Sequence, residues 1–449
     1  MLSQGCANNK KDIAKSSDSS LVRIITLAPG HFHAALLQKS MYDGVDSTVY
    51  VFAPGGEEVK SYLALIDGYN NRKESPTSWK EQVYTGPDYL EKMLARKSGN
   101  VVVIAGNNKM KTDNIKKCVD ARLNVLSDKP MAITSAGFDE LKEAFANAKN
   151  NKVLLYDIMT SRYEITNILQ KAFSRFPDIF GELQKGTLEN PAVFSESVHY
   201  FFKKVSGVPL IRPAWYFDVE QEGYGIVDIT THLVDLIQWE CFPEESLDYK
   251  KDIQMLAARH WATMLTPSQF RQVTKNDAYP DFLKKDVKDS LLYVLANGEM
   301  NYTIKDVHAR VSVEWQFEAP EGTGDTYFSR LRGSKAALII KQGKEQQYKP
   351  VLYIQPMDKK NQDNWEQAVE TGLGEIRKKY PGIDLKRNNQ GWEVLIPGAF
   401  NIDHEQQFSL VVKQYLNYLR QGNMPQWEIS GMLAKYYTTT QALEKAINK

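Results

Sequence analysis

The fold is decided by the stretch Leu21-Val22-Arg23-Ile24-Ile25-Thr26-Leu27-Ala28-Pro29-Gly30. Its first seven residues are mostly apolar and rich in β-branched side chains, which predicts a β-strand. Ala28-Pro29-Gly30 then breaks the strand, and residues 32–39 are compatible with a helix. A strand, a tight turn and a helix in this order form the first unit of a parallel α/β sheet.

The same alternation continues to about residue 155. Further strands are predicted at 48–52, 101–105, 124–127 and 153–156, and helices at 89–96, 113–121 and 138–149. Residues 57–86 are polar and irregular, with a helix expected only at 59–66. The run 101–105 is apolar without interruption, as in strands that are buried on both faces of a parallel sheet. We therefore predict a right-handed parallel α/β domain over residues 21–155.

The pattern changes after residue 155. Residues 308–317 alternate polar and apolar at period two, which predicts an antiparallel strand with one covered face. Segments 290–296, 327–331, 336–340 and 350–355 are its expected sheet partners, and helices are expected at 408–416 and 432–447. The predicted class is thus α/β followed by a larger α+β domain, residues 156–449, with an open, mainly antiparallel sheet. We expect this sheet to join two copies of the chain in a homo-oligomer.

The composition is that of a globular protein with almost no net charge. Of the 449 residues, 42% are hydrophobic and 25% are charged, and the formal net charge is +1. Such a balance gives no attraction for nucleic acid, and no apolar run reaches the ~18 residues that a membrane span needs. The three cysteines, Cys6, Cys118 and Cys241, are spaced too widely for a disulfide framework or a zinc site. We expect neither a metal ion nor a nucleic acid partner.

Residues 1–20 are polar and without periodicity, as in a flexible tether. Ser3-Gln4-Gly5-Cys6 resembles the end of a lipoprotein signal with Cys6 as the acylated residue, although only five residues precede it. Two interpretations stay open. Cys6 is either a lipid anchor of a periplasmic or membrane-tethered protein, or an ordinary tail cysteine of a cytoplasmic one.

The first strand-to-helix turn is a candidate phosphate-binding site, because helix amides point toward a ligand there. Of the pattern Gly-x-Gly-x-x-Gly only Gly30 is present, since Ala28 and His33 occupy the other two positions. Ala53 replaces the acidic residue expected for an adenosine ribose at the end of the second strand. The candidate cofactor-binding residues of this region are Ala28, Gly30, His31, Phe32, His33 and Ala53.

Two further segments carry candidate reactive groups. Ser127-Asp128-Lys129-Pro130 ends a predicted strand and puts Lys129 at the carboxyl edge of the sheet, where it would act as acid, base or hydrogen-bond donor. Asp228 and His232 are four residues apart, so we predict that they share one helical face and that the carboxylate orients the imidazole. The alternatives are a surface lysine and a structural Asp–His pair.

Together these segments resemble the glucose–fructose oxidoreductase / inositol dehydrogenase / MocA family. Asp128-Lys129-Pro130 is similar to its Glu-Lys-Pro motif, and Gly223 to His232 is similar to its Gly-Gly-x-x-x-Asp-x-x-x-His motif. The resemblance implies a Rossmann domain that binds NAD or NADP, with NAD slightly favoured, and a second domain of the oxidoreductase C-terminal subgroup. It also implies a catalytic group of Lys129, Asp228 and His232. By the same resemblance Asn107 and Asn108 would lie near the nicotinamide ribose, and Lys129 would also contact the cofactor.

The resemblance implies that hydride passes between nicotinamide and a sugar, glycoside or polyol hydroxyl, whose proton His232 accepts. The candidate substrate contacts are Arg162, Tyr163, His199, Arg212 and Trp215. One alternative enzyme would use transient oxidation to eliminate a glycosidic bond and then restore a tightly held NAD. An alternative of another class is a non-catalytic sugar- or nucleotide-binding protein, which the incomplete glycine pattern suggests.

Overall fold

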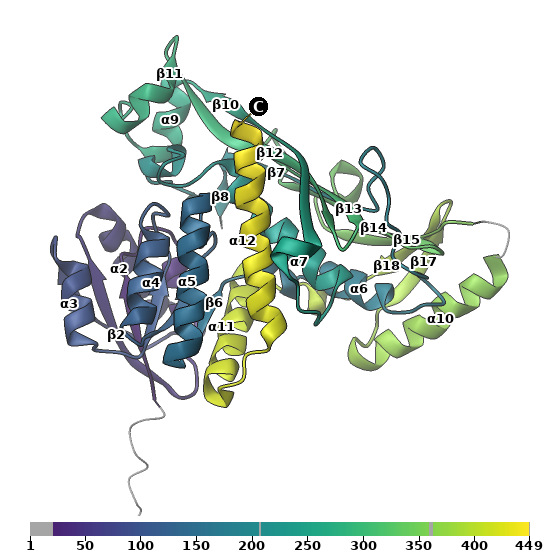
Figure 1. Cartoon of the computed structure of the whole chain (residues 1–449), viewed down its shortest axis with the longest axis horizontal. Helices are drawn as coiled ribbons and strands as arrows, with labels where there is room; N and C mark the ends of the chain where they lie inside the picture. Colours follow the sequence, from purple (N-terminus) through teal and green to yellow (C-terminus); the bar gives the residue numbers. More distant parts are fainter. Residues whose placement is uncertain (1–20, 206–207, 359–361, 449) are drawn as a thin grey trace, which may run out of the picture.

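The computed structural model describes residues 21–205, 208–358 and 362–448. Two lobes are visible in Figure 1, with the first lobe in purple and blue and the large sheet of the second lobe in teal and green. No helix in these described ranges is long and apolar enough to cross a membrane. The predicted tether and Cys6 lie outside the described residues.

The first lobe is a six-stranded parallel sheet in the order β3-β2-β1-β4-β5-β6. This strand order is that of dinucleotide-binding folds, in which ligands bind at the carboxyl ends of the strands. The strands are β1 Val22–Leu27, β2 Val45–Ala53, β3 Lys80–Thr85, β4 Val101–Ile104, β5 Asn124–Ser127 and β6 Leu155–Asp157. The helices are α1 His33–Leu36, η2 Leu37–Lys39, α2 Glu57–Asn71, α3 Tyr89–Arg96, α4 Lys111–Asp120 and α5 Ser135–Asn151.

The second lobe contains a ten-stranded sheet in which β13 and β7 pair in parallel and the other pairs are antiparallel. Its strands are β7 Val193–Phe202, β10 Ile253–Leu265, β11 Val287–Lys288, β12 Leu291–Ile304, β13 Val307–Glu318, β14 Thr326–Arg332, β15 Ala336–Gln342, β16 Val351–Pro356, β17 Asp384–Asn388 and β18 Gly391–Leu395. A separate two-stranded ribbon consists of β8 Lys204–Val205 and β9 Val208–Pro209. The predicted fold class, a parallel α/β sheet followed by a larger and mainly antiparallel α+β lobe, is confirmed.

Helices of the second lobe cover the side of the large sheet that faces the first lobe (Figure 1). The α-helices are α6 Ile165–Ser174, α7 Thr230–Cys241, α8 Tyr249–Asp252, α9 Pro267–Thr274, α10 Gln362–Lys379, α11 His404–Gln421 and α12 Gln426–Ile447. The short 3-10 helices are η3 Thr160–Tyr163, η4 Ala214–Phe217, η5 Gly225–Val227, η6 Asp281–Asp286, η7 Lys344–Gln346 and η8 Gly398–Phe400.

The last two helices join the lobes. Phe408, Val411 and Tyr415 of α11 and Tyr436 of α12 belong to the buried core of the first lobe. Helix α12 also packs against β10 of the large sheet and against α5 and α7 (Figure 1). Because burial of such apolar side chains stabilises by about 1.5–3 kcal/mol each, packing joins the two lobes as well as the polypeptide connection does.

Eight of the described strands were not expected from the sequence, namely β3, β7, β8, β9, β10, β11, β17 and β18. Strand β3 lies in the polar region 57–86, and its side chains are mostly exposed because it forms the edge of the sheet. Strands β7 and β10 were not identified, and β7 is the strand beside which β13 lies in parallel. The prediction of an antiparallel strand at 308–317 is therefore right for the β12 side only.

Candidate active site

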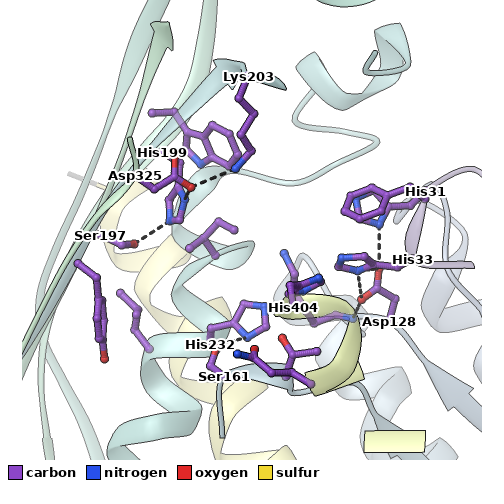
Figure 2. A pocket seen from close by; sticks show the side chains of 18 of the residues that line it. His31, His33, Asp128, Ser161, Ser197, His199, Lys203, His232, Asp325 and His404 are labelled. Atoms are coloured by element: carbon purple, nitrogen blue, oxygen red, sulfur yellow. Dashed lines mark hydrogen bonds and ion pairs between the residues drawn. The ribbon is translucent and has the colours of Figure 1, made fainter. Parts of the chain in front are cut away.

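Two adjacent cavities lie at the carboxyl edge of the parallel sheet and between the lobes. The first, which we call the nucleotide chamber, has a volume of about 450 Å³ and is lined by the strand ends Leu27, Ala53 and Ile104. The second, which we call the interlobe chamber, has a volume of about 500 Å³ and takes residues from both lobes (Figure 2). Gly106 and Trp215 line both chambers. Both volumes are typical of sites for small molecules and cofactors.

The turn after β1 keeps the backbone shape of a glycine-rich turn although two of the glycines are absent. Ala28 has a φ of +44°, in the left-handed region that favours glycine, and its N–H donates to the Phe52 carbonyl at 2.8 Å. Ala28, Gly30 and Ala53 line the nucleotide chamber with Asn107. Backbone therefore lies open to this chamber at the positions where a dinucleotide phosphate binds in this fold.

Asn107 and Asn108 follow β4 and face different chambers. Asn107 lines the nucleotide chamber, whereas Asn108 lines the interlobe chamber. The buried Oδ1 of Asn108 has no hydrogen-bond partner among the described residues. A buried acceptor without a partner is costly, and a ribose hydroxyl would satisfy it. The residues present therefore fit a dinucleotide that extends across both chambers.

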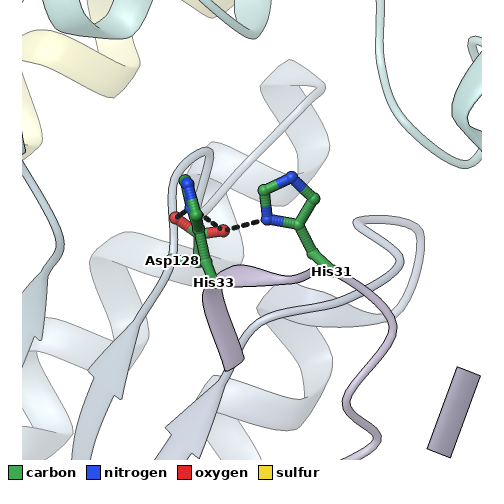
Figure 3. A group of neighbouring side chains, drawn as sticks. All are labelled: His31, His33 and Asp128. Atoms are coloured by element: carbon green, nitrogen blue, oxygen red, sulfur yellow. Dashed lines mark hydrogen bonds and ion pairs between the residues drawn. The ribbon is translucent and has the colours of Figure 1, made fainter. Parts of the chain in front are cut away.

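His31, Phe32 and His33 line the interlobe chamber and not the nucleotide chamber. His33 Nδ1 lies 3.0 Å and 3.1 Å from the two carboxylate oxygens of Asp128, and His31 Nδ1 lies 3.2 Å from one of them (Figure 3). Burial lowers the pKa of His33 to about 4, although Asp128 opposes this shift. Burial by itself would raise the pKa of Asp128, but the two imidazoles hold it well below its usual range. At neutral pH the rings are neutral and the carboxylate is charged.

Lys129 forms a buried ion pair with Asp228 of the second lobe. The exposed fractions of the two side chains are 10% and 6%. Burial favours a lower pKa for Lys129, but the charges of Asp228 and Asp128 outweigh burial and raise the pKa above its ordinary value. Lys129 is therefore a charged hydrogen-bond donor at neutral pH, and not a base.

The prediction that Asp228 orients His232 from the same helical face is wrong. Asp228 follows the short helix η5 and precedes α7, so it does not lie on the helix that carries His232. Its carboxylate contacts Lys129 instead. A pattern of four-residue spacing holds only within one helix, and here a break in the helix falls between the two residues.

His232 lies in the first turn of α7 and lines the interlobe chamber. Its Nδ1 is 3.3 Å from the hydroxyl oxygen of Ser161 (Figure 2). Burial lowers the pKa of His232 well below its usual range, and the charge of Lys129 adds to this shift, while Asp235 opposes it. The imidazole is thus neutral at neutral pH and is able to accept a proton.

Two ionisable residues of the site were missed in the sequence. Lys111 is 1% exposed, and its ammonium donates to the Asp128 carbonyl at 3.3 Å. Glu222 accepts from the Asn108 side chain at 3.1 Å, and burial and the charge of Asp228 raise its pKa well above its usual range. Glu222 directly precedes Gly223 of the quoted motif, which is the only sequence signal for it.

The predicted substrate contacts fall into two groups. His199, Arg212 and Trp215 line the interlobe chamber. On the sheet wall of this chamber, His199 lies 3.1 Å from Asp325 through Nδ1 and 3.0 Å from the Ser197 hydroxyl through Nε2 (Figure 2). These three side chains form part of the chamber lining that the second lobe contributes.

Arg162 and Tyr163 do not line either chamber. Arg162 donates to Asp235 at 2.6 Å and to Glu428 at 2.9 Å, and Lys435 donates to Asp235 at 2.9 Å. This buried network connects η3, α7 and α12. The structure therefore assigns Arg162 to the joint between the lobes, and Tyr163 packs against the core of the first lobe.

The fold and the paired chambers define a two-domain dehydrogenase, with a nucleotide domain and a catalytic domain that meet at one cleft. Residues 56–156 match the family model described as "Oxidoreductase family, NAD-binding Rossmann fold", and residues 169–447 match the one described as "Putative oxidoreductase C terminal domain". The chain belongs to the glucose–fructose oxidoreductase / inositol dehydrogenase / MocA family, in the group that carries this C-terminal domain.

Solved structures agree with this assignment. A "putative oxidoreductase" from Parabacteroides merdae ATCC 43184 is 52% identical, with a TM-score of 0.94 over 96% of this chain and 98% of that chain. An oxidoreductase structure from Erwinia carotovora atroseptica has 11% identity and a TM-score of 0.59 over 95% and 98% of the two chains. A 3-ketoreductase from Actinomadura kijaniata in complex with NADP and TDP-benzene has 12% identity and a TM-score of 0.55 over 92% and 95%. The last two show similarity of fold alone. No curated protein matches the chain.

The chain is therefore an NAD(P)-dependent oxidoreductase. The alternative of a non-catalytic binding protein is set aside. The incomplete glycine pattern that suggested it has a structural explanation, because Ala28 adopts a left-handed backbone conformation of the kind that favours glycine.

Proposed function

We propose that this protein transfers hydride between a hydroxyl of a sugar, glycoside or polyol and a nicotinamide cofactor. One observation carries the proposal: a charged Lys129 and a neutral His232, from different lobes, line the same chamber beside the nucleotide chamber. Oxidation of an alcohol needs a proton acceptor and a group that stabilises negative charge on oxygen. This pair supplies both functions.

In the oxidation direction, His232 accepts the proton of the substrate hydroxyl. Lys129 donates a hydrogen bond to the same oxygen and stabilises the charge that develops on it. The carboxylate of Asp228 pairs with Lys129, so Asp228 acts as a positioning residue that keeps the lysine charged and directed into the chamber. The nicotinamide, when bound, accepts the hydride.

The cofactor would be NAD rather than NADP. Glu58 lies in the first turn of α2 and lines the nucleotide chamber with Ala53, Pro54 and Gly55. Its carboxylate favours ribose hydroxyls and repels a 2′-phosphate. The only basic residue that lines the described part of this chamber is Lys109, which lies in the segment after β4.

The chemistry of the interlobe chamber favours a carbohydrate. Trp215, Tyr216 and Trp315 offer aromatic faces, and His199 and Asp325 offer hydrogen bonds beside them. Sugar rings present apolar faces and many hydroxyls, so a chamber of this mixed character suits them. The fold neighbour from Actinomadura kijaniata acts on a ketone, which supports the same class of reaction.

The test combines cofactor identification with a substrate screen. The protein is denatured after purification, the released nucleotide is identified by mass spectrometry, and sugars, glycosides and polyols are screened for NADH formation at 340 nm. We expect NAD and at least one substrate that is oxidised by the wild type and not by His232→Gln. Oxidation at equal rates by both proteins would remove His232 from this role.

A second candidate function is redox-assisted cleavage of a glycosidic bond with internal recycling of NAD. One contact between the lobes favours it. Trp215 of the second lobe donates to Glu58 of the first lobe at 2.7 Å and thereby closes over the cofactor cleft. A closure at the junction of the two chambers would retain the cofactor between turnovers. Release of an aglycone without net formation of NADH would distinguish this function from a simple dehydrogenase.

The proposal extends to location and assembly. An acylated Cys6 would tether the protein at a membrane, and a retained cofactor suits an exported enzyme. We also propose that the open sheet joins two copies of the chain. Metabolic labelling with palmitate in wild type and Cys6→Ser tests the anchor, and light scattering of the purified protein tests the dimer.

A further inference from the structure

One cluster in the interlobe chamber has no role in the proposed hydride transfer. His31 lies in the turn after β1, His33 begins α1, and Asp128 directly follows β5, 95 residues after His33. The three residues each offer one ligand atom, and these atoms lie within 4.8 Å of one another (Figure 3). Two imidazoles and one carboxylate are the donor set of many zinc sites that keep an open position.

The spacing of the three side chains suits a bound ion. The Nδ1 atoms of His33 and His31 lie 3.0 Å and 3.2 Å from the same Asp128 oxygen, Oδ2. With metal–ligand distances of about 2.0–2.1 Å, tetrahedral ligand atoms lie roughly 3.3 Å apart. The other carboxylate oxygen, Oδ1, accepts from the Lys129 backbone N–H at 2.9 Å, which fixes the orientation of the carboxylate. Such supporting contacts are typical of metal ligands.

A purely structural hydrogen-bonded cluster explains these contacts less well. The Nδ1 atom of His31 is buried and makes no hydrogen bond of acceptable geometry among the described residues, although it is 3.2 Å from Asp128. The His404 ring stacks on His33 with the ring centres 5.1 Å apart, which holds that imidazole in place. The cluster thus has a buried nitrogen without a hydrogen bond, His31 Nδ1, beside the charged carboxylate of Asp128 and the fixed ring of His33.

The charges nearby leave room for a cation. Lys111 and Lys129 are the ammonium groups that face Asp128, and Asp228 and Glu222 are the carboxylates that face these lysines. Burial lowers the pKa of Lys111 and raises the pKa of Glu222, so both groups shift toward their neutral forms. Without these two groups, Asp128 and Asp228 carry two formal negative charges against the one positive charge of Lys129. The cluster also lines the interlobe chamber, so a metal there would have coordination positions open to water or to substrate oxygens.

We propose that His31, His33 and Asp128 bind one divalent transition-metal ion of the zinc class on the wall of the interlobe chamber. Its open positions would take hydroxyl or carbonyl oxygens of the substrate. This site was not expected from the sequence, because Asp128 lies 95 residues after His33 and the two histidines alone do not mark a metal site. The proposal does not depend on which substrate the enzyme oxidises.

The test measures metal binding directly. Chelator-treated protein, without added cofactor, is titrated with ZnCl2 against a chromophoric chelator, and with CoCl2 by visible absorption. We expect one equivalent of zinc and a cobalt spectrum of low coordination number. His33→Gln and Asp128→Asn should each weaken zinc binding by at least about 100-fold, beyond the ~10–100-fold typical of supporting residues. His260→Gln, on β10 and away from both chambers, should bind as the wild type does.

Thermal unfolding of each metal-free variant shows whether it is folded, so that loss of binding is read only from folded protein. The proposal is overturned if the wild type binds no zinc, or if folded His33→Gln and Asp128→Asn bind zinc as tightly as the wild type. The latter result would show adventitious binding elsewhere on the chain. Because no step of the test uses enzyme activity, its outcome is independent of the proposed dehydrogenase function.

Discussion

The two chambers differ in what forms them. The nucleotide chamber is lined largely by strand ends and turns of one lobe, with small residues such as Ala28, Gly30 and Ala53. The interlobe chamber is lined by ionisable and aromatic side chains from segments far apart in the chain, among them Lys129 and His232. A binding site formed by backbone atoms tolerates changes in sequence. The function of a site formed by side chains depends on each of those side chains. The predictions below test this difference.

The largest effect is expected for His232→Ala. Because a positioned general base contributes typically ~10²–10⁴-fold, kcat should fall by at least about 100-fold while KM changes little. Steady-state kinetics of substrate oxidation give the measurement, with His260→Gln as the matched control. Near-normal turnover of His232→Ala would place the proton acceptor elsewhere.

A large effect on stability and pH dependence is expected for Asp228→Asn. Removal of one partner of a buried ion pair typically costs about 3–5 kcal/mol, because the other charge is left unpaired. Since Asp228 raises the pKa of Lys129, the variant should lose activity at lower pH than the wild type on the alkaline side of the profile. The double variant Lys129→Met, Asp228→Asn should regain stability without regaining activity. A pH–activity profile that is unchanged on its alkaline side would contradict the ion pair between Lys129 and Asp228.

A moderate effect concerns the pH dependence of stability. The pKa of His33 is about 4 in the folded protein, below the value near 6.5 of an unfolded histidine. Below pH 6.5 the unfolded chain therefore binds a proton that the folded chain does not, so the free energy of unfolding decreases as the pH falls from 6.5 toward 4. Thermal midpoints across this range should fall for the wild type and fall less steeply for His33→Gln. Parallel curves would show that His33 does not titrate in this way.

A smaller effect is expected for Glu58→Gln in the nucleotide chamber. The substitution removes one negative charge and keeps an acceptor for Trp215. With a Coulomb energy of about 1 kcal/mol in a solvated cleft, the preference for NAD over NADP should decrease by roughly fivefold. Titrations of both nucleotides by fluorescence measure the ratio. An unchanged ratio would mean that Glu58 does not face the ribose.

The smallest effect is expected for Ala28→Gly. Glycine relieves the left-handed strain of Ala28 but adds freedom to the unfolded chain, so we expect a net gain of about 0.5–1 kcal/mol in stability. The Kd of the nucleotide should stay within about twofold of the wild type, because the backbone shape is unchanged. A large change in Kd would show that the methyl group itself faces the cofactor.

The same contrast explains how far the sequence was informative. The strand at Asn124–Ser127 and the helix at Tyr89–Arg96 follow local patterns, and the structure has them with the predicted bounds. Lys129 was placed correctly at the sheet edge because it lies two residues after the end of a strand. Such features depend on residues that are close in the chain.

Pairing between distant residues was not predictable. The partner of Asp228 is 99 residues away, and the helix break before α7 that decides this pairing has no strong local signal. Arg162 was assigned to the substrate on its position in a motif, but Asp235 and Glu428 neutralise it inside the protein. Which buried charge meets which is decided by tertiary packing, and a single sequence does not display it.

The central claim is that one dinucleotide spans both chambers and presents its nicotinamide ring between Lys129 and His232. A crystal structure of the protein with NADH tests this most directly. The account predicts the adenosine in the nucleotide chamber and the nicotinamide in the interlobe chamber, with space beside Lys129 and His232 for a substrate carbon at about 3.5 Å from the ring. A nicotinamide ring bound outside the interlobe chamber, remote from both side chains, would contradict it.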